Sequence, residues 1–206
     1  NGNRDLARDF LSLAVEASNA APAPSLCYAA VLLEDERLLP AEEVLIKALR
    51  QAPDDIDLLV RLGDVYVRMK DWPRVEQVEK TLRDSGDENK IRAADGLRAG
   101  RLMAQGRSKE SIAFLEGLAS ANAGDAGARI ALIRARLTQG DVEGALKTAE
   151  EAVAALPDNT GLRLALASVR SGSGDLAGAE AIYRAAVAAD PKLVLAWLEL
   201  VRLKEV

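Results

Sequence analysis

The sequence predicts an all-α chain of repeated helix pairs, and two observations support this fold class. The first is an internal repeat: Gly-Asp-Val-Glu-Gly-Ala at 140–145 returns as Gly-Asp-Leu-Ala-Gly-Ala at 174–179, 34 residues later. A fixed interval of this length is typical of stacked supersecondary units. The second is periodicity, because apolar residues recur at helical spacing and no window alternates with period two. We therefore expect helices and no strands.

Prolines and acidic residues divide the first half of the chain into six expected helices. Two prolines within 19–25 should forbid helix continuation, so the second helix is expected only from Ser25. Pro40 suits the first turn of the third helix, because it has no amide hydrogen to leave unpaired. Asp71 is suited to cap the fifth helix. These helices are expected near 4–18, 25–35, 40–51, 55–69, 72–84 and 88–105.

Short turns that contain glycine divide the second half in the same way. Gly106, Gly140 and Gly174 lie in these turns, and such short connections make neighbouring helices antiparallel. The expected helices span 109–121, 126–139, 142–156, 159–171 and 176–189, with a last helix from about residue 192.

Composition and charge argue against several classes of function. Apolar residues make up 49% of the 206-residue chain, which is ample for a buried core. The net charge of −5 lacks the basic excess that a general nucleic-acid or anionic-membrane surface needs. No apolar run approaches the roughly 18 residues needed to cross a bilayer. The single cysteine, Cys27, allows no intrachain disulfide.

The residue types predict no catalytic, metal or cofactor site. The chain contains no histidine, which removes the commonest general base and the commonest metal ligand. Gly-Ser-Gly at 172–174 lacks a preceding strand and is interpreted as a turn. The acidic residues at 54–57 lie at a helix start, where they favour the helix dipole, so we interpret them as a cap. Cys27 is expected to be a packed, inert thiol. We predict that the chain is not an enzyme.

The repeat resembles the tetratricopeptide repeat, whose signature is Trp-x2-Leu-Gly-x2-Tyr, then Ala-x3-Phe, then Pro. Leu-x2-Leu-Gly-x2-Tyr at 59–66 matches the first half of this signature. Ala179-x3-Tyr183, followed by Ala186 and Pro191, matches the second half, and Trp-x2-Leu at 197–200 restarts the first. The resemblance implies a right-handed superhelical solenoid of antiparallel helix pairs, and the Gly-, Ala- and Arg-rich composition is similar to that of bacterial members.

The whole chain, 1–206, is expected to form one such solenoid and to be a piece of a longer array. Residues 1–21 correspond to the second helix of a preceding repeat, and 194–206 to the first helix of a further repeat or to a cap. About five full repeats lie between these half repeats, near 22–55, 56–91, 92–125, 126–159 and 160–193.

Small and aromatic residues are expected at the contacts between helices. Gly63 and Ala167 should lie where the two helices of one pair approach closely. Trp72 and Trp197 fall at repeat positions that normally pack, so we expect core or helix-pair contacts there rather than ligand stacking. Four alanines should lie where a second helix meets its neighbours: Ala145, Ala152, Ala179 and Ala186.

In this family the first helix of each pair lines a concave face that binds extended or helical peptides, so the resemblance implies a peptide groove. The second and third repeats supply Asp57, Val60, Asp64, Val67, Arg68 and Met103 to it. The fourth and fifth supply Ile130, Arg134, Leu137, Thr138, Leu164 and Ser168. The matched Lys and Asn side chains that clamp a partner's terminal carboxylate in some members are missing. The competing interpretation is that the apolar residues pack against neighbouring helices or against further repeats.

We therefore predict a non-catalytic scaffold for protein–protein interaction that binds a protein or peptide, needs no cofactor, binds no nucleic acid and does not span a membrane. Similar proteins often organise bacterial envelope, secretion or polysaccharide-export assemblies, so the bacterial cytoplasm or periplasm is the expected location. The alternative is a regulatory or sensor domain of a larger enzyme. Self-association through apolar surface on exposed terminal helices is a third hypothesis.

Overall fold

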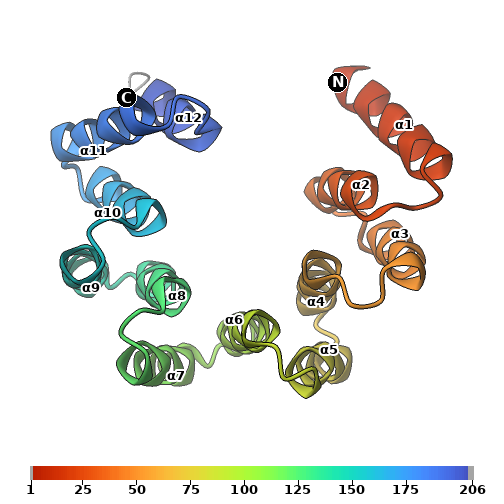
Figure 1. The fold of residues 1–206 in the computed structure, drawn as a ribbon, viewed down its shortest axis with the longest axis horizontal. Coiled ribbons are helices and arrows are strands. Elements are labelled where there is room, and N and C mark those ends of the chain that lie inside the picture. The colour runs from red at the N-terminus through yellow and green to blue at the C-terminus, as the bar shows by residue number, and fades with distance from the viewer. Residues whose placement is uncertain (1, 204–206) are drawn as a thin grey trace. The chain divides into compact units, whose positions relative to one another are not determined.

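The computed structural model describes residues 2–203, with side chains from residue 5 onward, and within this range it contains twelve α-helices and no strand (Figure 1). The predicted all-α class is confirmed. The chain divides into two compact units, Asn1–Gln105 and Gly106–Val206. Unit 1 contains α1 (Gly2–Ala17), α2 (Pro22–Glu34), α3 (Leu38–Gln51), α4 (Ile56–Met69), α5 (Trp72–Asp84) and α6 (Glu88–Ala104). Unit 2 contains α7 (Ser108–Ala121), α8 (Ala126–Thr138), α9 (Val142–Ala155), α10 (Thr160–Gly172), α11 (Leu176–Ala189) and α12 (Val194–Arg202).

Helix α2 begins at Pro22, three residues earlier than the sequence predicts. The prediction was wrong because it treated both prolines of this segment as helix breakers. Pro22 and Pro24 lie in the first turn of α2, where amide hydrogens have no intrahelical partner in any case. The proline ring therefore costs the helix no hydrogen bond at either position.

Unit 1 is held together by α4, which packs against α2, α3, α5 and α6. The leucines at 32, 45, 58 and 82 and the valines at 65 and 75 are fully buried between these helices. Trp72 is partly buried against the same core, as predicted.

Gly63 provides the space in which α6 packs against α4. A Cβ atom at this position would lie 2.5 Å and 2.7 Å from the two methyl carbons of Leu97, which is itself a buried residue of α6. The sequence analysis placed Gly63 at the contact between two helices of one pair. The structure corrects this: the close approach is between α4 and the first helix of the next pair.

Two groups of charged side chains connect helices of unit 1. The guanidinium of Arg74 on α5 lies over the ring of Tyr66 at 4.4 Å, donates to the Asp71 carboxylate at 2.7 Å and pairs with Glu42 on α3. Arg101 on α6 makes a two-bond contact with Glu79 on α5, at 2.8 Å and 3.2 Å. The Arg101 and Glu79 side chains are only 12% and 9% exposed, so this ion pair lies in the helix interface.

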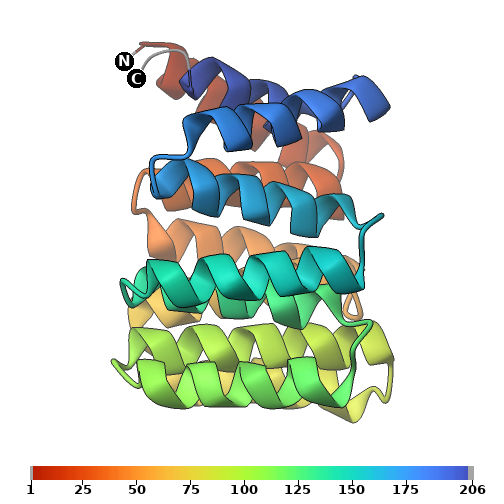
Figure 2. The ribbon, with the colours of Figure 1, turned by 90° about the vertical axis from the view of Figure 1, so that its left-hand side faces the viewer.

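In unit 2, helices α8, α10 and α12 form one row, and α7, α9 and α11 form a second row (Figure 1). The helices α7, α9, α10 and α11 lie one above another (Figure 2). Ala145, Ala152 and Ala179 are fully buried and Ala186 nearly so. This agrees with the prediction that small residues allow second helices to approach their neighbours.

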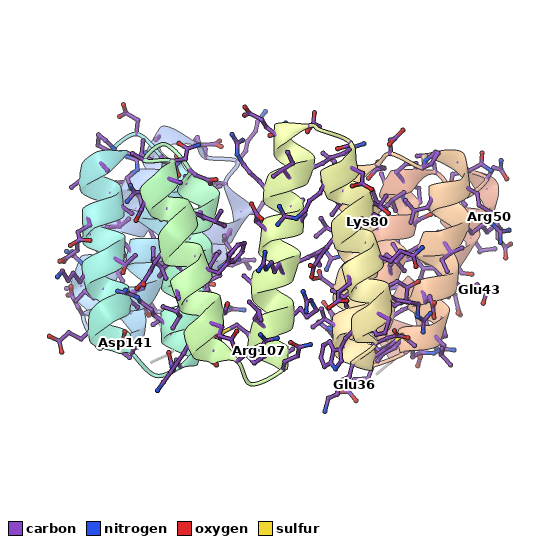
Figure 3. The ribbon with its side chains drawn as sticks, turned by 90° about the horizontal axis from the view of Figure 1, so that it is seen from below. Glu36, Glu43, Arg50, Lys80, Arg107 and Asp141 are labelled. Carbon is purple, nitrogen blue, oxygen red and sulfur yellow. The ribbon has the colours of Figure 1, made fainter. Side chains whose placement is uncertain are left out.

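The repeated hexapeptide forms the turn between two helices and the first turn of the second helix. Gly140 and Gly174 have φ angles of 82° and 92°, which residues with a Cβ rarely adopt. The next residue, Asp141 or Asp175, caps the following helix by accepting from a glycine amide three residues on, at 2.9 Å in both turns. Figure 3 shows Asp141 at the same end of unit 2 as Arg107, which precedes α7.

Several apolar side chains remain exposed on the described part of the chain. Trp197 on α12 is 50% exposed, with its indole nitrogen donating to the Pro191 carbonyl at 3.1 Å, so of the two expected kinds of contact the core contact is wrong for this residue. Cys27 is also exposed, which contradicts the expectation of a packed thiol. None of the helices in residues 2–203 is long and apolar enough to cross a membrane.

Candidate functional site

A cavity of about 310 Å³ lies in unit 2 between the first-row helices α8, α10 and α12, with one side chain from α11. We refer to it as the unit 2 cavity. It is lined by Ile130, Ile133, Arg134 and Leu137 of α8, Gly161, Leu164, Ala165 and Ser168 of α10, Tyr183 of α11, and Leu195 and Glu199 of α12.

Helical spacing explains how two helices present so many residues to one cavity. Ile130, Arg134 and Leu137 are four and three residues apart, so they lie on one face of α8. Leu164 and Ser168 are four apart on α10 in the same way. Gly161 allows Ile130 to approach α10, since a Cβ there would lie only 3.2 Å from the Ile130 Cδ1 atom.

The cavity has an apolar base and a polar rim. Ile133 and Tyr183 are buried, whereas Ile130, Leu137 and Leu164 are partly exposed to the cavity. Arg134, Ser168 and Leu195 lie at its exposed edge. Such a distribution, mostly apolar with a few polar groups, is typical of a binding pocket.

Two titratable groups face the cavity from α11 and α12. Burial raises the pKa of the Tyr183 phenol, Glu199 acts in the same direction, and Arg202 opposes them. The phenol therefore stays protonated and neutral near neutral pH. The Glu199 carboxylate accepts from the Arg202 guanidinium at 2.7 Å, which offsets its charge.

The sequence profile of the tetratricopeptide repeat family matches residues 102–169 and, again, 136–202. The chain is a tetratricopeptide repeat protein. The two matches start 34 residues apart, the interval that relates the two turns at 140 and 174. No curated protein matches the sequence.

Solved structures of tetratricopeptide repeat proteins share this fold. A thermophilic protein of Thermus thermophilus is 19% identical, and the match covers 88% of this chain and 98% of that one, with a TM-score of 0.60. A protein from Parabacteroides merdae is 15% identical over 100% of this chain and 79% of that one, with a TM-score of 0.61. At such low sequence identity, the likeness shows only that the folds are similar.

The predicted groove residues of unit 2 in this tetratricopeptide repeat protein converge, with one exception. Ile130, Arg134, Leu137, Leu164 and Ser168 all line the unit 2 cavity. Thr138 does not line it. Its hydroxyl donates to the backbone carbonyl of Arg134 at 2.9 Å, so its polar group is bonded to its own helix.

The predicted groove residues of unit 1 have other contacts. Val60 and Val67 pack partly buried against the unit 1 core, and Arg68 on α4 donates to the Leu33 carbonyl of α2 at 3.0 Å. Burial raises the pKa of Asp64, while Arg61 and Arg68 oppose this.

Asp57 is exposed in the first turn of α4, and Met103 is partly buried on α6. The packing of Val60 and Val67 against the unit 1 core favours the competing interpretation, in which apolar residues pack against neighbouring helices.

The part of the site that α11 and α12 supply was not predicted from the sequence. Tyr183 was interpreted only as a signature position, and Leu195 only as part of a half repeat. The repeat interval could have predicted the residues of α12, because α12 follows α10 at the interval at which α10 follows α8. Among the described residues, no group of three His, Cys, Asp or Glu side chains could hold a metal ion.

Proposed function

We propose that this tetratricopeptide repeat protein is a non-catalytic interaction scaffold that binds an apolar peptide or helical segment in the unit 2 cavity. The fold itself indicates protein or peptide partners in general, and proteins of this family are generally non-catalytic. The observation that carries the finer proposal is the convergence of residues from α8 and α10, with Tyr183 and Leu195, around one apolar cavity. Helices that dock apolar side chains in a groove are an established mode of peptide recognition.

The size of the cavity suits a few apolar side chains of a partner. Two buried anchors such as Leu or Phe would contribute about 3–6 kcal/mol. Loss of translational and conformational freedom offsets part of this gain. We therefore expect the affinity of a single short segment to lie between about micromolar and millimolar.

The experiment is a pull-down from source-cell extract that compares the parent chain with a Leu137→Gln, Leu164→Gln variant. Both changes place uncharged polar groups in the cavity, so the test is independent of charge. Segments of the retained protein are then synthesised with a fluorophore, and their binding is measured by fluorescence anisotropy. We expect the double variant to bind the responsible segment at least about tenfold more weakly, the loss of roughly one apolar anchor.

The matched control is Leu198→Gln, because Leu198 is exposed on α12 and does not line the cavity. Circular dichroism must show that every variant is folded. The proposed site would be contradicted if the parent chain, the double variant and the Leu198→Gln control retained the partner equally. It would also be contradicted if the control lost the partner as the double variant does. If a partner is retained through the cavity, its identity would also indicate the assembly and the compartment in which the chain acts. We propose that the source is bacterial.

A further inference from the structure

We infer that the segment bound in the unit 2 cavity is acidic, and that a carboxylate beside its apolar anchor pairs with Arg134. This inference rests on the proposed function and adds the chemistry of the partner. It follows from the distribution of charge over the first-row helices of unit 2 and from the contacts of each arginine on them.

Helices α8 and α10 are basic, although the chain as a whole carries a net charge of −5. Neither helix contains an Asp or a Glu. A surface with one sign of charge attracts partners of the opposite sign and disfavours others. Together the two helices carry five arginines: Arg129, Arg134, Arg136, Arg163 and Arg170.

Two of these arginines are neutralised by second-row helices. Arg136 donates to Glu116 of α7 at 2.6 Å and to the Thr148 hydroxyl of α9 at 2.7 Å. Arg170, 34 residues later, donates to Glu150 of α9 at 3.4 Å. These side chains therefore connect helices within the unit.

Two others lie away from the cavity. The Nε atoms of Arg129 and Arg163 are buried without a hydrogen-bond partner among the described residues, and neither residue lines the unit 2 cavity. Arg163 is bonded to Thr160 on its own helix, at 3.4 Å.

Arg134 differs from the other four. Its side chain is exposed at the edge of the unit 2 cavity, and its guanidinium makes no hydrogen bond or ion pair with the part of the chain that the structure describes. Glu199 is the one carboxylate among the lining residues, and it is paired with Arg202. The cavity thus presents one cation whose charge no group of residues 5–203 offsets. A planar guanidinium suits a carboxylate, which it can bind through two parallel hydrogen bonds.

The test uses three fluorescent pools of short synthetic peptides. Each pool fixes a pair of Leu or Phe anchors at helical spacing, and the positions flanking the anchors are all Glu, all Gln or all Lys. The parent chain should bind the Glu pool about two- to fivefold more tightly than the Gln pool, and the Lys pool most weakly. High salt should reduce this preference, because the pair is exposed to solvent.

Substitution of Arg134 then separates charge from packing. Arg134→Gln should bind the Glu and Gln pools equally, and Arg134→Glu should prefer the Lys pool. Arg184→Gln is the matched control, because Arg184 is an exposed α11 residue that pairs with Glu180 and does not line the cavity. The control should keep the preference of the parent chain.

Each outcome distinguishes the inference from the proposed function. If Leu137→Gln weakens all pools while the parent chain binds them equally, the cavity is a peptide site and the inference of an acidic partner is wrong. If no pool binds in a manner that Leu137→Gln affects, the proposed function fails and the inference fails with it. A labelled oligothymidylate that binds as tightly as the Glu pool, and depends equally on Arg134, would show general affinity for anions and overturn the inference.

Discussion

At the scale of single residues, Tyr183 links the cavity to the pH dependence of folding. Burial and Glu199 raise the pKa of its phenol above the ordinary value of 10.0. The folded chain then holds this proton more tightly than the unfolded chain does. The phenol's contribution to stability is therefore fully present below pH 10.0 and is lost as the pH rises above it, through the raised pKa of the folded chain.

We expect Tyr183→Phe to lose less stability than the parent chain between neutral pH and the range above the ordinary phenol pKa. Phe cannot ionise, so the unfavourable burial of a phenolate disappears. Urea unfolding near neutral pH and above pH 10.0 measures the difference in stability. Tyr28→Phe in unit 1 is the matched control. An identical alkaline loss in Tyr183→Phe and in the parent would show that this phenol does not contribute.

Individual side chains also show what the sequence could and could not predict. The residues of the α8 face were predictable because their spacing along a helix fixes which of them share a side. The exposure of Trp197 and Cys27 was not, because exposure depends on what covers a residue rather than on its repeat position. Ser168 was predicted at the site since it follows Arg134 by one period.

At the scale of helices, two glycines on neighbouring first helices should respond to alanine in opposite ways. Gly63→Ala places a methyl group against the buried Leu97 side chain and should destabilise the chain by about 1–3 kcal/mol. Gly100→Ala meets no atom within 4 Å and should stabilise α6 by about 0.5–1 kcal/mol.

Thermal unfolding measured by circular dichroism compares the two variants directly. The loss in the Gly63→Ala, Leu97→Ala double variant should be smaller than the sum of the two single losses, because Leu97→Ala removes the methyl groups that the new side chain meets. Stabilisation of the chain by Gly63→Ala alone would mean that α4 and α6 are less closely packed than described.

The Arg101–Glu79 pair gives a second prediction about helix contacts. Arg101→Met leaves the buried Glu79 carboxylate without its main partner and should cost about 3–5 kcal/mol in the free energy of unfolding. Replacing both residues, as Arg101→Met with Glu79→Leu, should restore most of this stability, because the buried Glu79 charge is removed together with its partner. Glu76, which also pairs with Arg101 at 3.0 Å, is 59% exposed and stays solvated.

Chemical denaturation of the two single variants and the double variant measures this coupling. Arg92→Met is a suitable control, since its ion pair with Glu88 lies within one helix and is exposed. Additive losses in the double variant would show that the two side chains act independently.

Most helices were predictable because capping residues and turn glycines lie at fixed places in the repeat. The exception, the start of α2, failed because proline has opposite effects at the beginning and in the middle of a helix. The sequence before Ser25 does not by itself show which of these positions a proline occupies. The partner of Gly63 also required the structure, because a small residue marks a close approach without naming the helix that approaches.

At the scale of the whole chain, apolar side chains remain exposed on α1 and α12. Leu6, Phe10 and Leu13 follow one face of α1 and are 54%, 62% and 59% exposed. On α12, Leu195, Trp197 and Leu198 are exposed as well. Exposed apolar surface of this kind favours association. Self-association therefore stays a prediction.

Light scattering at a low and a high protein concentration tests it. We expect a mass above the 21.9 kDa of one chain at the high concentration, and a lower mass for a Phe10→Glu, Leu13→Glu variant. A mass of one chain at both concentrations would contradict the prediction.

The period of the repeat explains how much of the site was predictable. Ile130 and Leu164, like Arg134 and Ser168, are related by one period, and all four line the unit 2 cavity. Unit 1 follows the same helical rules, yet Val60 and Val67 pack against its core and Arg68 bonds to α2. Equivalent positions in the repeat therefore lie on the same face of the first helices. Whether a cavity forms on that face depends on the side chains at those positions.

The matching turns at 140 and 174 also bear on how a gene for such a chain can change in length. Recombination that removed residues 141–174 would join Gly140 to Asp175 and recreate one intact Gly-Asp-Leu-Ala-Gly-Ala turn. The left-handed glycine, the helix cap and the small residues would all be kept, because each position is filled by one copy or the other. Unequal crossing-over could thus shorten or lengthen the chain by a whole helix pair, and the new junction would have the same turn sequence as the old ones. Inherited changes in length would then add or remove whole repeats rather than single residues.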